Sequence, residues 1–140
     1  MKSKIRIYYD SLTGNVERFI RKLKGKDELE FVKISSKTVL EKEGHLVTFT
    51  TGFGNIPKTT LEFLKNNDNY LKIKTVCSSG NMNWGSNFAK AGSLIQNQFN
   101  IKYIYRFELS GTLNDVEEYL NRIKIFESEG VKIDEVDLFK

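Results

Sequence analysis

The chain has 140 residues, the usual size of a single domain with its own hydrophobic core. Apolar residues make up 39% of the sequence and charged residues 29%, a composition that excludes an intrinsically disordered chain. The formal net charge is +4, and the cationic residues are spread along the chain instead of forming the concentrated basic stripe of a nucleic-acid-binding protein. We therefore expect no nucleic-acid partner.

The sequence also lacks the usual features of membrane, metal-binding and disulfide-bonded proteins. No apolar stretch approaches the roughly 20 residues that span a bilayer, so we expect no membrane partner and a cytoplasmic location. Cys77 is the single cysteine and His45 the single histidine, which excludes an intramolecular disulfide and leaves too few ligands for a closed zinc site. We expect no metal, and we interpret Cys77 as a small buried side chain and His45 as part of a solvated turn.

The N-terminal part of the chain alternates β-rich runs with one helical pattern. Apolar residues at helical spacing, Val16, Phe19, Ile20 and Leu23, follow the first β-rich run and predict a helix. The third β-rich run is almost continuously apolar, as in strands that are buried on both faces. The predicted strands span residues 4–9, 29–34 and 45–50.

The C-terminal part repeats this alternation. Pro57 is expected in the first turn of a helix, and Thr112 with Asp115 forms a capping pattern at the start of the last helix. The predicted strands span residues 71–77 and 101–109. The apolar stripes of the three predicted helices are Leu61, Phe63 and Leu64; Phe88, Ala91, Leu94 and Ile95; and Val116, Tyr119, Leu120 and Ile123.

Five strands that alternate with helices predict an α/β fold, a doubly wound parallel sheet with helices on both faces. Residues 1–125 form the single predicted domain, and residues 126–140, with sparse apolar positions, are interpreted as a C-terminal extension or tail. Ligands of such folds bind beyond the carboxyl ends of the strands. The loops after strands one, three and four lie at that edge and are the richest in glycine and hydroxyl groups, so we expect the site there.

The first of these loops, within the segment DSLTGNVERF at residues 10–19, is suited to an anion. Ser11 and Thr13 offer hydroxyl donors, Gly14 allows close approach of the backbone, and Asn15 can donate from its amide. The N–H groups at the start of the following helix favour a phosphate. An ordinary helix cap by one hydroxyl remains the alternative at this stage.

Four segments together resemble the NrdI family of small flavodoxin-like FMN proteins, from about Ile5 to about Ile123. They are DSLTGNVERF, TTGFGNIP at residues 50–57, SSGNMNWGSNFAKAG at residues 78–92 and RFELSGT at residues 106–112. The resemblance implies a flavodoxin-like sheet of order 2-1-3-4-5 with FMN as the cofactor. Val16 stands where ordinary flavodoxins often have a second threonine, and Met82 where several relatives have a basic residue.

The resemblance also implies which residues hold the cofactor: the loop after strand one for the phosphate, and the other two for the ring system. The alternative for Trp84 is that it only covers the hydrophobic core at the start of a helix. We interpret Arg18 and Arg21 as part of a solvated helix face. The implied cofactor-binding residues are Ser11, Leu12, Thr13, Gly14, Asn15, Val16, Thr50, Thr51, Gly52, Phe53, Gly54, Ser79, Gly80, Asn81, Asn83, Trp84 and Gly85.

The function that the resemblance implies is activation of another enzyme, with the chemistry carried by the flavin and by no catalytic side chain. Reduced FMN would react with dioxygen and supply a superoxide-level oxidant to the small subunit of a class Ib ribonucleotide reductase, for assembly of its dimanganese-tyrosyl radical cofactor. A reductase would supply the electrons. Two alternatives stay open: a general electron shuttle of flavodoxin type, and a flavin-free interaction module on the same fold.

Overall fold

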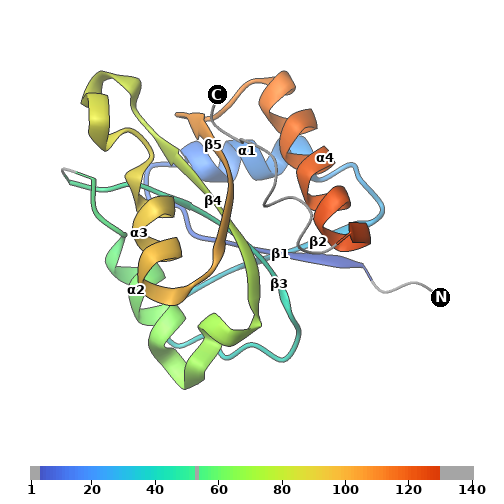
Figure 1. Ribbon diagram of the computed structural model, residues 1–140. Coiled ribbons are helices and arrows are strands. Elements are labelled where there is room, and N and C mark those ends of the chain that lie inside the picture. The colour runs from blue at the N-terminus through green and yellow to red at the C-terminus, as the bar shows by residue number, and fades with distance from the viewer. Residues whose placement is uncertain (1–3, 53, 130–140) are drawn as a thin grey trace.

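A computed structural model describes residues 4–52 and 54–129. Its five strands form one parallel sheet of order β2-β1-β3-β4-β5, which confirms the predicted fold and strand order (Figure 1). The strands are β1 (Ile5–Tyr9), β2 (Leu29–Lys33), β3 (Gly44–Phe49), β4 (Ile73–Gly80) and β5 (Lys102–Glu108).

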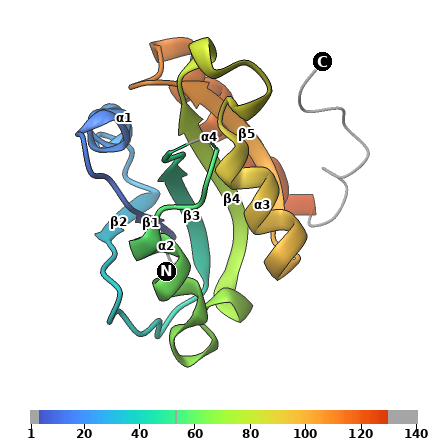
Figure 2. The ribbon, with the colours of Figure 1, turned by 90° about the vertical axis from the view of Figure 1, so that its left-hand side faces the viewer.

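Helices cover both faces of the sheet, α1 and α4 on one face and α2 and α3 on the other (Figures 1 and 2). This arrangement follows from the crossover connections that parallel neighbouring strands need. The α-helices are α1 (Asn15–Leu23), α2 (Lys58–Lys65), α3 (Lys90–Phe99) and α4 (Leu113–Glu129). Two short 3₁₀ segments, η1 (Asn66–Lys72) and η2 (Met82–Asn87), precede β4 and α3.

Each face of the sheet has its own hydrophobic core. Under α1 and α4, the ring of Phe19 stacks on Phe107 at a centroid distance of 4.0 Å and meets Tyr119 edge-on at 5.6 Å. Under α2 and α3, Phe63 and Ile95 belong to a second buried cluster. Cys77 is fully buried in the first core, as predicted.

The ends of the elements differ from the predictions in a few places. The capping pattern is confirmed, because Thr112 Oγ1 accepts a hydrogen bond from Asp115 N–H at 3.1 Å and Asp115 Oδ2 accepts one from Thr112 N–H at 2.8 Å. Pro57 stands just before α2 instead of in its first turn. Leu71, predicted in a strand, is 68% exposed in η1.

His45 is the clearest departure from the sequence analysis. Its side chain is fully buried within β3 and not in a solvated turn. Helix α4 continues beyond Ile125 to Glu129, and within this last part Glu127 contacts His45. Residues 130–140 of the expected tail lie outside the described residues.

Candidate functional site

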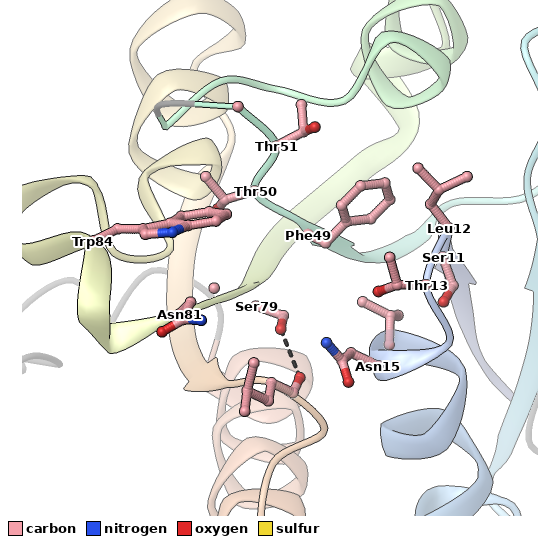
Figure 3. Close-up of a pocket in the computed structure, with 14 residues that line it drawn as sticks. Ser11, Leu12, Thr13, Asn15, Phe49, Thr50, Thr51, Ser79, Asn81 and Trp84 are labelled. Carbon is pink, nitrogen blue, oxygen red and sulfur yellow. Dashed lines mark hydrogen bonds between the residues drawn. The ribbon is translucent and has the colours of Figure 1, made fainter.

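A cavity of about 280 Å³ opens at the carboxyl edge of the sheet, where the loops after β1, β3 and β4 meet (Figure 3). Its volume lies near the lower end of the range for small-molecule sites, roughly 300–1,000 Å³. Its walls are Ser11, Leu12, Thr13, Asn15, Val16, Phe49, Thr50, Thr51, Gly52, Ser79, Gly80, Asn81, Trp84 and Leu109.

The loop between β1 and α1 presents the amino end of α1 to the cavity. Gly14 stands at the helix start with φ of +94°, a left-handed conformation that favours glycine, and it makes no side-chain cap. Ser11 Oγ accepts a hydrogen bond from Glu17 N–H at 3.2 Å. The first N–H groups of a helix have no partner within it, so those of Asn15 and Val16 favour an anion at this end of the cavity.

The loop between β3 and α2 forms a second wall. Thr51 and Asn55 exchange backbone hydrogen bonds of 3.0 and 2.8 Å, which closes a tight turn around Gly52 and Gly54. Thr50 Oγ1 lies 3.1 Å from Ser78 Oγ and accepts a hydrogen bond from Ala91 N–H at 3.2 Å. These hydrogen bonds of Thr50 connect the second wall of the cavity to β4 and to α3.

The loop after β4 and the end of β5 form the third wall. Asn81 Oδ1 accepts a hydrogen bond from Asn83 N–H at 2.9 Å and thereby starts η2, which carries Trp84. Trp84 is 40% exposed and lies at the cavity, so it is not simple core cover (Figure 3). Ser79 Oγ donates to the carbonyl of Leu109 at 2.7 Å and holds Leu109 against the cavity.

The structure places most of the predicted residues at this cavity. Of the others, Gly14, Gly54, Asn83 and Gly85 belong to its loops without lining it, and Phe53 lies outside the described residues. Two wall residues were missed, Phe49 and Leu109. Phe49 was assigned to strand interior and Leu109 to a strand end, and their position beside the loops depends on the sheet register.

The cavity combines apolar surfaces with polar groups that do not ionise. Among the described residues, none that lines it carries an acidic, basic or imidazole side chain. The described residues also hold no group of three acidic, histidine or cysteine residues that could bind a metal ion, and no helix among them is long and apolar enough to cross a membrane. The walls offer hydroxyl and amide groups for hydrogen bonds and the apolar surfaces of Phe49, Trp84 and Leu109 for a flat ring.

A buried chain of hydrogen bonds lies beside this site. Thr60 Oγ1 donates to Asp10 Oδ2 at 2.6 Å, and Thr48 Oγ1 lies 2.7 Å from Thr60 Oγ1. All three side chains are buried. Burial raises the pKa of Asp10, and the hydrogen bond from Thr60 opposes that rise. The chain links the strand before the first loop to the first turn of α2.

Replacing Thr60 with valine, which preserves its shape, should lower the free energy of unfolding at pH 7 by about 2 kcal/mol. The Asp10 carboxylate and the Thr48 hydroxyl both lose a partner. Without its donor, Asp10 has a still higher pKa in the folded state. The free-energy cost of ionising the buried carboxyl group then grows as the pH rises through that pKa, so the loss of stability should be smaller at pH 4 than at pH 7. Urea unfolding at both pH values measures it, with Thr59→Val as the control at the adjacent position. An equal loss at both pH values would contradict an ionised Asp10.

Fold and cavity together define a flavodoxin-like protein. A short-chain flavodoxin associated with a bacterial microcompartment superposes with a TM-score of 0.65 at 16% identity, over 88% of this chain and 95% of that chain. Flavodoxin 2 from Bacillus cereus superposes with a TM-score of 0.63 at 22% identity, over 90% of this chain and 99% of that chain. These likenesses establish the fold.

The chain belongs to the NrdI flavodoxin-like family, which it matches over residues 7–121. The SPbeta prophage-derived protein NrdI of Bacillus subtilis (strain 168) is 35% identical over 127 residues, 91% of this chain and 97% of that protein. Protein NrdI of Bacillus licheniformis is 40% identical over 133 residues, 94% of this chain and 98% of that protein. The resemblance inferred from the four sequence segments is thereby confirmed.

Proposed function

We propose that this chain binds FMN in the cavity at the carboxyl edge of the sheet and activates the small subunit of a class Ib ribonucleotide reductase. The observation that carries the proposal is a cavity, walled by three loops of an NrdI-family chain, that offers anion-binding N–H groups and apolar surfaces but no ionisable side chain. Such a site has no acid or base of its own. A bound flavin would therefore supply the chemistry in this proposal.

The residues present fit FMN. The loop from Ser11 to Val16 suits the phosphate, because helix N–H groups, hydroxyls and the Asn15 amide face one end of the cavity. Residues 50–54 and 79–85 would hold the ring system, with Trp84 and Phe49 as apolar contacts. Bound at these residues and reduced by a reductase, FMN would supply the electrons that convert dioxygen to a superoxide-level oxidant, which the small subunit would use to assemble its dimanganese-tyrosyl radical cofactor.

The protein's own contribution is to bind, orient and partly enclose the cofactor. Leu12 is 78% exposed and Trp84 is 40% exposed, on opposite sides of the cavity, so its rim reaches the solvent at both residues (Figure 3). Dioxygen can enter there, and the oxidant can leave toward a docked subunit. The absence of acids from the described lining also avoids repulsion of a negatively charged cofactor.

The test is assembly of the tyrosyl radical in the manganese-loaded small subunit. The FMN-loaded protein is reduced without oxygen, mixed with the subunit and then exposed to oxygen, and the radical is measured by electron paramagnetic resonance. Radical well above that obtained with free reduced FMN is expected. A yield equal to the free-FMN control would contradict the activating role.

Two further measurements separate the alternatives. Electron transfer to an unrelated acceptor of flavodoxins that is as fast as reaction with the small subunit would support a general shuttle instead. Purified protein without flavin absorption that also fails to bind added FMN would indicate a flavin-free interaction module.

A further inference from the structure

Arg18 connects the first loop of the site to the loop after β5. Its Nη2 donates to Asn15 Oδ1 at 2.6 Å, and its Nε donates to Ser110 Oγ at 2.9 Å. Ser110 Oγ in turn donates to Asn15 Oδ1 at 3.0 Å. The three side chains form a closed triangle of hydrogen bonds, although Ser110 lies 95 residues from Asn15 in the sequence.

This triangle fixes the orientation of the Asn15 amide. Two donors converge on one atom of that amide, and only its oxygen can accept them. The nitrogen, which carries two donor hydrogens, is then directed to the cavity that Asn15 lines, as Figure 3 shows. The reversed amide would place its N–H groups against the guanidinium, which can only donate, and would lose the hydrogen bond from Arg18.

The Ser110 corner of the triangle is itself held in place. Lys22 Nζ, one helical turn beyond Arg18, donates to the carbonyl oxygens of Ser110 at 3.3 Å and Gly111 at 2.7 Å. Gly111 has φ of +71°, and a Cβ there would lie 2.8 Å from the ring of Phe19. The loop after β5 therefore packs closely against α1 and presents Ser110 to Asn15.

We propose that Arg18 and Ser110 are positioning residues that present the Asn15 amide nitrogen as a donor to the phosphate of FMN. Neither residue lines the cavity, so each acts through Asn15. The inference rests on the proposed FMN site. Arg18 is exposed, as the sequence-based interpretation of a solvated helix face expects, and its hydrogen bonds to Asn15 and Ser110 add the positioning role to that interpretation.

The experiment compares the affinities of the apoprotein for FMN and for riboflavin, which lacks the phosphate, by quenching of flavin fluorescence. Arg18→Gln and Ser110→Ala should each weaken FMN binding roughly tenfold, about the effect of one hydrogen bond to a charged group, and leave riboflavin binding within about twofold of wild type. A purely structural role would weaken both ligands alike. Equal losses for FMN and riboflavin would therefore overturn the proposal.

Two comparisons separate orientation of the amide from simple attraction by charge. In an Asn15→Ala background, Arg18→Gln should weaken FMN binding by less than about twofold, because the group that it positions is gone. Arg21→Gln removes the same charge from the same helix and should bind FMN like wild type. A full additional loss in the Asn15→Ala background, or an equal loss for Arg21→Gln, would overturn the proposal. Wild-type protein that binds no FMN would instead refute the proposed function.

Discussion

Valine in place of Gly14 should abolish the retention of FMN. We expect the affinity to fall at least about 100-fold, equivalent to about 2.7 kcal/mol, because the N–H groups around this residue form the end of the cavity where we propose that the phosphate binds. Gly14 has φ of +94°, which a β-branched residue adopts only under strain. A Cβ at this position would also lie 2.9 Å from Arg18 Nη1, so the loop and the guanidinium must move apart.

The measurement is titration of the apoprotein with FMN, with circular dichroism to confirm that the variant is folded. Gly25→Val is the matched control. A Cβ at Gly25 has no heavy atom within 4 Å and the residue has no positive φ, so the control should bind FMN like wild type. Unchanged affinity in Gly14→Val would show that the phosphate does not lie in the loop at residues 11–15.

The sequence predicted the fold and the edge of the sheet at which the cavity opens, because both depend on local patterns. The apolar runs of β1 and β3 and the stripe from Val16 to Leu23 can be recognised without the structure. The stripe and most of both strands are buried, as expected. The three loops are marked by glycine and hydroxyl residues. In a parallel sheet their common edge follows from the topology.

The departures from the prediction arise from contacts between distant segments. Leu71 precedes an alternating run and was assigned to β4, but the Asn69 side chain binds the carbonyls of Thr38 and Phe63 and the N–H of Leu40. These hydrogen bonds hold the chain in η1 up to Lys72, so the strand begins at Ile73. The sequence around Asn69 is polar and does not indicate that its side chain binds backbone groups of distant residues.

The role of Arg18 was hidden for the same reason. Ser110 follows Arg18 by 92 residues, and only the packing of α1 against the loop after β5 brings the two together. Exposure alone favoured a solvated face, since exposed charges usually contribute little. The hydrogen bonds of the guanidinium, and not its burial, are the observation from which we propose a positioning role for Arg18.

Alanine in place of His45 should lower the free energy of unfolding at pH 7.5 by about 3 kcal/mol, through a cavity and the loss of a partner for two side chains. The Nδ1 atom of His45 lies 2.7 Å from Thr75 Oγ1, and its Nε2 lies 3.0 Å from Glu127 Oε2 in the last turns of α4. Phe126 contacts the ring edge-on at 5.9 Å. Chemical denaturation measures this loss of stability. The substitution should leave FMN affinity unchanged, because His45 lies near the start of β3, at the opposite end of the strand from the cavity.

The same histidine should make stability depend on pH. Burial lowers the pKa of His45, so the folded protein keeps the ring neutral, with Nε2 donating to Glu127 and Nδ1 accepting from Thr75. The hydrogen bond from His45 holds the pKa of Glu127 at about 2, and this carboxylate stays ionised throughout pH 5 to 7.5. As the pH falls through about 6.5, the unfolded chain binds a proton that the folded chain does not, and stability decreases.

Because His45 is the only histidine, one substitution isolates this effect. Between pH 7.5 and 5 the contribution reaches up to about 2 kcal/mol, since each proton bound only by the unfolded chain costs about 1.4 kcal/mol per pH unit below 6.5. His45→Gln keeps an amide that can pair with Thr75 but does not titrate, and it should lose correspondingly less stability over this interval. Asp10, whose pKa is raised by burial, is present in both proteins, so its contribution cancels in the comparison. Equal losses in wild type and His45→Gln would mean that the buried ring takes up its proton in the folded state, as an ion pair with Glu127.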